Sequence, residues 1–176
     1  CGSSQQALHF AAQAVMSGTQ DVVIAGGVEV MSLVPIGASV KDGYDAGHGF
    51  PFNAKGIEDR YPGVFFSQFT GAELVAEKWK LSRIDLDKFA LESHKKAAHA
   101  TSEGYFDREI IPIESKSDAI DTSMISNDEG IRYDASLEAL SGLKTVSDGG
   151  VITAGNASQI TDGASAVMVC NEKGLS

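Results

Sequence analysis

The sequence is poor in cysteine, and this limits the covalent and metal chemistry that it can support. Cys1 and Cys170 are the two cysteines in 176 residues, too few for a disulfide framework. Neither stands in a CxxC pair or at a spacing from histidine that is typical of zinc sites. The scattered histidines, which we interpret as structural or surface residues, are His9, His48, His94 and His99. We therefore expect no metal site and no bound cofactor. Free thiols indicate a reducing compartment, for which the cytoplasm is the default.

Long apolar runs and an excess of positive charge are also lacking. No stretch approaches the roughly 20 apolar residues of a membrane-spanning helix, so we expect no membrane segment. The first residues include no Met and no secretory signal, and we expect the chain to be an internal piece of a longer protein. The net charge of -10 argues against nucleic acid as a partner, because phosphate backbones require clustered Lys and Arg. An anionic small ligand stays possible, since local amides and a few basic side chains can bind one.

The composition that is present is that of a globular protein, with 43% hydrophobic and 22% charged residues. Residues 3–18 are rich in Ala and other helix formers and end at Gly18, a natural C-cap. Apolar residues run almost all the way round this helix, which predicts that it is buried. The β-branched run 22–27, closed by a Gly pair, predicts a buried strand. A helix followed directly by a buried strand indicates an α/β fold.

The middle of the chain differs in composition from the first segment. Residues 34–63 are rich in Gly and Pro without periodicity and predict a long functional loop. Helices are predicted over 70–80 and, after a capping-box pattern at Ser82 and Asp85, to about residue 102. The remaining predicted elements are an edge strand at 108–114, a polar loop at 115–132, a short helix from 136, a strand from 151, a Gly/Asn/Ser loop, and a strand at 164–170. This order predicts a core of residues 1–34 and 158–176 that carries an inserted lobe, residues 35–157.

Cys1 stands at the N-terminal end of the first predicted helix. A thiol there feels the positive end of the helix dipole and nearby free amides, which favour the thiolate. The same amides are suited to hold a developing oxyanion. On this feature alone the alternative is a cysteine that acts only as a small hydrophobic residue.

Three separate blocks, in the same order, resemble the thiolase family. The first block is Cys1, Gly2, Ser3, Ser4, Gln6 and Ala7. The second block, a Gly pair followed by Glu and Met-Ser, is Gly26, Gly27, Glu29, Met31 and Ser32. The third block is Thr153, Ala154, Gly155, Asn156, Ala157, Ser158, Asp162, Gly163 and Ala164. Residues 82–113 and 128–144 resemble the family's loop domain. The resemblance covers essentially the whole chain. It implies a layered α/β core (αβαβα in the full enzyme) with an inserted α+β loop domain that binds CoA, and it leaves the C-terminal thiolase domain outside this sequence.

The resemblance implies roles for four residues. Cys1 would be the catalytic nucleophile that takes the acyl group from acyl-CoA as a thioester, in ping-pong fashion. Ala154 and Ser158 match positions that contact the pantetheine arm of CoA, and Arg132 matches an arginine that lies along the CoA nucleotide. The residue chemistry agrees, because a Gly/Asn/Ser loop offers amides and an arginine suits an anionic nucleotide. The alternatives are that Ser158 only caps its own turn and that Arg132 is a solvated surface charge.

The sequence departs from the family pattern at several points. Ser67 stands where many biosynthetic members carry a histidine, so a short acetoacetyl substrate is not implied. Gln159 replaces the more usual glycine after Ser158. No histidine lies in the family's Gly-His-Pro context, and we interpret Cys170, at the end of a strand, as a core residue rather than the second catalytic cysteine. The nucleophile therefore has no base within this sequence.

The activity implied is that of an acyl-CoA C-acyltransferase of fatty acid metabolism and β-oxidation, which cleaves 3-ketoacyl-CoA with CoA or runs the reverse Claisen condensation. The resemblance implies acyl-CoA and CoA as partners, with CoA as a substrate, and a homodimer or homotetramer. One alternative is a ketoacyl-synthase-type condensing enzyme of the same fold. Another is a non-catalytic truncated chain that binds CoA, and this chain by itself is expected to be inactive.

Overall fold

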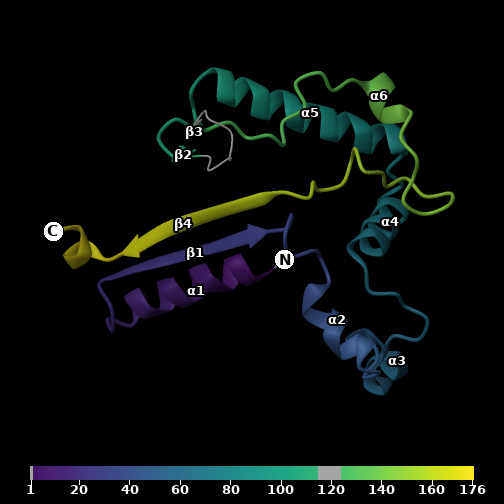
Figure 1. Ribbon diagram of the computed structural model, residues 1–176, viewed down its shortest axis with the longest axis horizontal. Helices are drawn as coiled ribbons and strands as arrows, with labels where there is room; N and C mark the ends of the chain where they lie inside the picture. The colour runs from purple at the N-terminus through teal and green to yellow at the C-terminus, as the bar shows by residue number, and fades with distance from the viewer. Residues whose placement is uncertain (1, 115–123) are drawn as a thin grey trace. The chain divides into compact units, whose positions relative to one another are not determined.

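A computed structural model describes residues 2–114 and 124–176 of the chain (Figure 1). The chain divides into two units, residues 1–50 with 160–176 and residues 51–159. The first unit contains α1 (Ser3–Met16), β1 (Val22–Val30), α2 (Ala38–Asp45), β4 (Asp162–Cys170) and the 3₁₀ turn η2 (Glu172–Leu175). The second unit contains η1 (Pro51–Asn53), α3 (Lys55–Arg60), α4 (Gln68–Trp79), α5 (Arg83–Ser102), β2 (Ile113–Glu114), β3 (Met124–Ile125) and α6 (Leu137–Ser141). The chain contains both helices and strands, as expected for an α/β fold.

The first unit is built on two strands from opposite ends of the sequence. β1 and β4 pair antiparallel over nine residues each, from Val22 opposite Cys170 to Val30 opposite Asp162. At Gly26 a Cβ would lie 3.1 Å from the carbonyl oxygen of Ser165, so the absence of a side chain permits this close approach. The predicted strand at 164–170 is confirmed, and it begins two residues earlier than expected.

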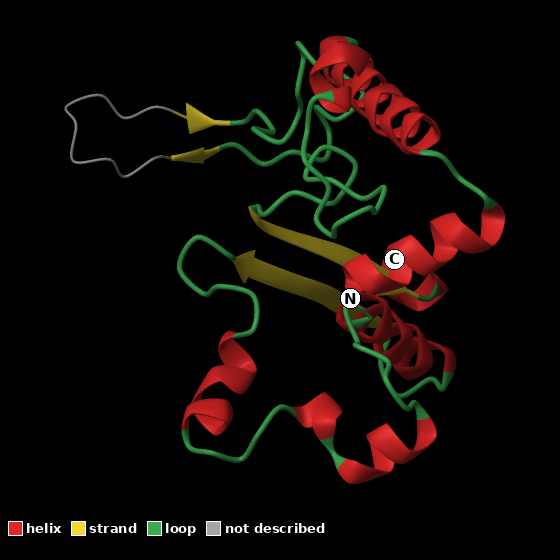
Figure 2. Ribbon diagram, turned by 90° about the vertical axis from the view of Figure 1, so that its right-hand side faces the viewer, coloured by secondary structure: helices red, strands yellow, loops and turns green. Residues whose placement is uncertain are grey.

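Helix α1 packs along one side of the β1–β4 pair (Figures 1 and 2). Ala11 and Val15 are buried on the side of the helix that packs. The prediction that α1 is buried all round is wrong for this chain, because Phe10 and Met16 remain 62% and 86% exposed. The prediction of a fully buried strand fails in the same way at Ile24, which is exposed. One helix on two strands has a single mutual interface, so the other apolar faces lie open.

The end of β4 is fastened to the start of β1. The side chain of Asn171 donates to Asp21 at 3.0 Å, and Nζ of Lys173 lies 2.6 Å from the same carboxylate. The Lys173 ammonium, aided by the Asn171 amide, lowers the pKa of Asp21. Cys170 lies at the end of its strand as predicted and is a half-buried free thiol.

In the second unit the two longer helices begin at serine caps. Ser67 Oγ accepts the N–H of Phe69 at 3.2 Å and caps α4. Ser82 Oγ accepts the N–H of Asp85, and the Asp85 carboxylate accepts the N–H of Ser82, which confirms the predicted capping box at the start of α5. The hydroxyl and N–H of Ser82 also lower the pKa of Asp85. The helix predicted over 70–80 is confirmed as α4, but it begins two residues earlier, after the Ser67 cap.

The segment 34–63 is more regular than the sequence predicts, since it contains α2 and α3. Each of these short helices carries a lysine–aspartate pair four residues apart, Lys41 with Asp45 and Lys55 with Asp59. Such pairs support a helix on one face, and they compensate in part for the nearby glycines. The prediction of an irregular loop over 34–63 is wrong at these two helices.

The borders of the two units fall at 50/51 and 159/160, whereas the sequence-based division lies at 34/35 and 157/158. The assignment of 35–157 as a CoA-binding loop domain stays a prediction. Of the strand predicted at 108–114, residues 113–114 form β2, which pairs with β3. In the described part of the chain, no helix is long and apolar enough to cross a membrane.

Candidate functional site

The segment 151–156, where the sequence predicts a strand followed by a loop, is held by a side chain of α4. The Glu73 carboxylate accepts the N–H groups of Val151, at 3.0 Å, and of Ile152, at 2.9 Å. In a β-strand, these backbone N–H groups would donate to the carbonyls of a neighbouring strand. The prediction of a strand from Val151 is therefore wrong, apart from an isolated bridge between Thr145 and Thr153.

Asn156 closes the loop on itself. Its Oδ1 accepts the N–H of Thr153 at 2.8 Å, and its Nδ2 donates to the Val151 carbonyl at 3.1 Å. Thr153 is fully buried, and its hydroxyl accepts the N–H of Gly155 at 3.2 Å. Backbone groups of the loop are thus satisfied by its own side chains, which fixes its shape.

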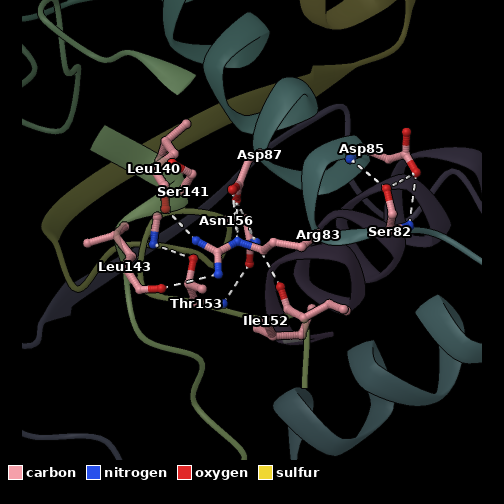
Figure 3. Close-up of polar contacts among 12 residues, drawn as sticks. Ser82, Arg83, Asp85, Asp87, Leu140, Ser141, Leu143, Ile152, Thr153 and Asn156 are labelled. Atoms are coloured by element: carbon pink, nitrogen blue, oxygen red, sulfur yellow. Dashed lines mark hydrogen bonds and ion pairs between the residues drawn. The ribbon is translucent and has the colours of Figure 1, made fainter. Parts of the chain in front are cut away.

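A buried carboxylate of α5 forms the base of this loop (Figure 3). Asp87 is 2% exposed and accepts from Asn156 Nδ2 at 3.0 Å and from Arg83 Nε at 2.8 Å. The Arg83 guanidinium in turn donates to the carbonyls of Leu140 and Leu143, at and just beyond the end of α6. The charge of Asp87 is therefore paired and hydrogen-bonded, as a buried charge requires. One ion pair fixes α5, α6 and the loop together.

Ala154 and Ser158 lie exposed on this loop. Within the described residues, Ser158 Oγ makes no hydrogen bond to its own turn, because Asn156 and Thr153 supply those contacts. The interpretation of Ser158 as a hydroxyl that only caps its own turn therefore lacks support. The hydroxyl of Ser158 and the surrounding backbone are accessible to a ligand that carries amides.

Arg132 lies in a second segment of the same unit. It follows the buried Ile131, and its backbone N–H donates to Nδ1 of His94 at 3.2 Å. Its side chain is exposed and forms no ion pair with the residues that the structure describes. This arrangement suits an anionic ligand and equally suits a solvated surface charge.

The two segments meet at a hydrogen bond. Nε2 of Gln159 donates to the carbonyl of Gly130 at 2.6 Å. Gln159 directly follows Ser158, and Gly130 lies two residues before Arg132. The structure therefore brings together the segments of three of the four predicted site residues, Arg132, Ala154 and Ser158. Cys1 lies outside the described residues.

Three residues that sequence reasoning had not assigned to the site build its support. Glu73, Asp87 and Asn156 hold the loop, yet each is far in sequence from at least one of its partners. The Arg83–Asp87 spacing of four residues on a predicted helix was the signal available for one of them.

In the first unit, Ser32 and Asp162, both members of the family blocks, bond to each other. Ser32 donates its N–H, at 2.9 Å, and its hydroxyl, at 2.5 Å, to the carboxylate. These bonds lower the pKa of Asp162, with the Ser32 hydroxyl as the main cause.

No group of His, Cys, Asp and Glu side chains within the described ranges is arranged to hold a metal ion.

Comparison with known proteins gives the site a family context. The model of the thiolase N-terminal domain matches residues 1–173. Among similar proteins, a steroid 3-ketoacyl-CoA thiolase (FadA6) of Mycobacterium tuberculosis is 46% identical over 99% of this chain and 42% of its own length. A 3-ketoacyl-CoA thiolase of Aliivibrio fischeri is 39% identical over 98% of the chain and 42% of its own length. An acetyl-CoA acetyltransferase of Paracoccus denitrificans is 40% identical over 98% of the chain and 44% of its own length. The chain thus spans less than half the length of these relatives. It belongs to the thiolase family, through the N-terminal domain of that family.

Proposed function

We propose that the protein containing this chain is an acyl-CoA C-acyltransferase of the thiolase type. It cleaves 3-ketoacyl-CoA with CoA, or condenses two acyl-CoA molecules in the reverse direction. The single observation that supports this best is the contact between Gln159 and Gly130, which places the Ser158 loop beside the Arg132 segment. An amide-bearing arm and an anionic nucleotide, the two ends of CoA, require these two kinds of surface side by side.

In the proposed reaction the thiolate of Cys1 attacks the 3-keto carbon of the substrate. The bond between that carbon and the α-carbon then breaks, the acyl group stays on Cys1 as a thioester, and the α-carbon takes a proton to give acetyl-CoA. The thiol of a second CoA attacks the thioester, and Cys1 is released as the thiol that starts the next cycle. The groups that move these protons are expected outside this chain, as the family resemblance implies.

The chain's described residues contribute binding rather than bond cleavage. The exposed Ser158 hydroxyl and the backbone around Ala154 would hold the pantetheine arm, since the loop beneath them is fixed by Glu73 and Asp87. Arg132 would meet the phosphate-bearing nucleotide, because a guanidinium pairs with phosphate through several donors at once.

A thiolysis assay on the complete protein tests this function. With a 3-ketoacyl-CoA and CoA, the products are acetyl-CoA and an acyl-CoA shortened by two carbons. The Arg132→Ala variant should raise the KM for CoA with kcat preserved, since the contact is lost equally before and during reaction. An unchanged KM would assign Arg132 to the surface-charge alternative, and absence of both products would reject the proposed activity.

We further propose acyl groups larger than acetoacetyl as substrates. One relative is named a steroid 3-ketoacyl-CoA thiolase. Ser67, which replaces the histidine of many biosynthetic members, uses its hydroxyl to cap α4 and borders a groove lined by Phe66 and Leu74. A series of 3-ketoacyl-CoA substrates tests this: kcat/KM should rise beyond four carbons, and a maximum at acetoacetyl-CoA would contradict it.

We also propose that CoA acts as a substrate with no bound cofactor or metal, in a cytoplasmic homodimer or homotetramer. The free thiol of Cys170 and the exposed apolar side chains of α1 support the compartment and the assembly. Activity should survive dialysis against a chelator, and sedimentation should give a mass of two or four chains. A monomer at working concentration would contradict the proposed assembly, and loss of activity with the chelator would contradict the proposal that no metal is bound.

A further inference from the structure

The Gln159–Gly130 hydrogen bond joins two segments of the second unit that lie 29 positions apart in the sequence. On one side, the loop that ends at Ser158 is held by Glu73 and by the Asp87–Asn156 contact. The loop is therefore anchored to α4 through Glu73 and to α5 through Asp87. Gln159 follows the end of this loop, and its side-chain amide donates to the Gly130 carbonyl at 2.6 Å.

The segment on the other side is short and is attached at two further points. Ile131 is buried, and Arg132 donates its N–H to Nδ1 of His94. Within the segment itself, Gly130 donates its N–H to Oδ1 of Asp128 at 2.7 Å. A Cβ at position 130 would lie 3.0 Å from Asp128 Oδ1 and 3.1 Å from Gln159 Oε1. Glycine at 130 therefore allows the carboxylate and the amide to approach the backbone closely.

We infer that Gln159 is a positioning residue that sets the place of Arg132 relative to Ser158 for the nucleotide end of CoA. This inference rests on the proposed function. A glycine at position 159 would have no side chain that could make this contact. In this chain the Gln159 amide links the Ser158 loop to the Arg132 segment. The groups that would bind the pantetheine arm and the nucleotide of CoA are therefore held in a fixed geometry.

The test compares two thiols in the thiolysis reaction of the complete protein, CoA and free pantetheine, which lacks the nucleotide. Gln159→Met removes the donor with little change in size or charge, and Gln159→Gly removes the side chain. Gln20→Met is the matched control, because Gln20 is exposed and its side chain makes no hydrogen bond with the described residues. Thermal unfolding of each variant establishes that it is folded.

The expected result is a KM for CoA raised roughly 2- to 10-fold in both Gln159 variants, which corresponds to one net hydrogen bond. The kcat with CoA and the KM for pantetheine should stay within about 2-fold of wild type, since only nucleotide placement is lost. In an Arg132→Ala background, Gln159→Met should have no further effect, because the two changes remove the same interaction.

Two results would overturn the inference. In the first, the Gln159 variants raise the KM for CoA and for pantetheine equally, or raise neither, while Arg132→Ala does raise the KM for CoA. The nucleotide contact of Arg132 then stands, but Gln159 has no positioning role. The other is an Arg132→Ala variant with unchanged KM for CoA, which rejects the nucleotide contact of the proposed function and the Gln159 inference with it.

Discussion

Asp87 accepts a hydrogen bond of 3.0 Å from Nδ2 of Asn156, although the two residues lie 69 positions apart in the chain. The same carboxylate pairs with Arg83, whose guanidinium holds the carbonyls of Leu140 and Leu143 (Figure 3). One buried charge thus unites α5, the end of α6 and the loop that carries the candidate CoA contacts. Loss of either partner should be felt both in stability and in the shape of the loop.

Asp87→Ala should destabilise the protein by about 3–5 kcal/mol, because it leaves the half-buried Arg83 without its partner. Asn156→Ala should cost about 1–3 kcal/mol, the penalty for unsatisfied buried polar groups. Urea unfolding of the two single variants and the double variant measures both values and their coupling, which should be at least 0.5 kcal/mol. Asp134→Ala, at an exposed carboxylate, is the control. Additive effects of the two changes would contradict the coupling.

Glu73→Ala should weaken the same loop from its other end. The variant leaves the N–H groups of Val151 and Ile152 without their carboxylate acceptor, at a cost of about 1.5–3 kcal/mol. Hydrogen exchange of these two amides should accelerate markedly in the variant. Glu77→Ala, one turn further along α4, changes an exposed carboxylate that has no hydrogen bond to the described residues, and it should leave both amides protected. Equal exchange in the two variants would contradict the role of Glu73.

The bonds between Ser32 and Asp162 predict a dependence of stability on pH. Because the folded-state pKa of Asp162 is lowered, its contribution is fully present above the unfolded pKa of about 3.9 and is lost as the pH falls through the folded value. Ser32→Ala should therefore be less stable than wild type at neutral pH, and the two proteins should converge in acid. Denaturant unfolding between pH 2 and 7 measures this, with Ser165→Ala on β4 as the control. A difference that does not narrow as the pH falls below the unfolded pKa would point to a cause other than this carboxylate.

The elements that sequence reasoning predicted well are those specified by nearby residues. The start of α5 follows from Ser82 and Asp85, three positions apart, and the end of α1 follows from Gly18, whose φ of +74° is the left-handed conformation that glycine favours. Ala154, Ser158 and Arg132, the candidate CoA residues that the resemblance implied, lie in two segments that are in contact, and their roles stay predictions.

The elements that could not be predicted depend on partners distant in sequence. Residues 151–153 have the apolar, β-branched character of a strand, yet Glu73 takes their N–H groups, and nothing in the local sequence signals this. The burial of α1 was overestimated for a related reason. An all-round apolar surface shows that a helix can be buried on every side, but among the described residues of α1 only Ala11 and Val15 are fully buried.

The most direct test of the central claim is the mass of the complete protein after brief mixing with a 3-ketoacyl-CoA in the absence of free CoA. The account predicts an added acyl mass that maps to the peptide containing Cys1 and disappears when CoA is supplied. The adduct should persist in Cys170→Ala and be absent in a folded Cys1→Ala variant. An acyl adduct that persists in Cys1→Ala, or that maps to another residue in the wild-type protein, would contradict the assignment of Cys1 as the nucleophile.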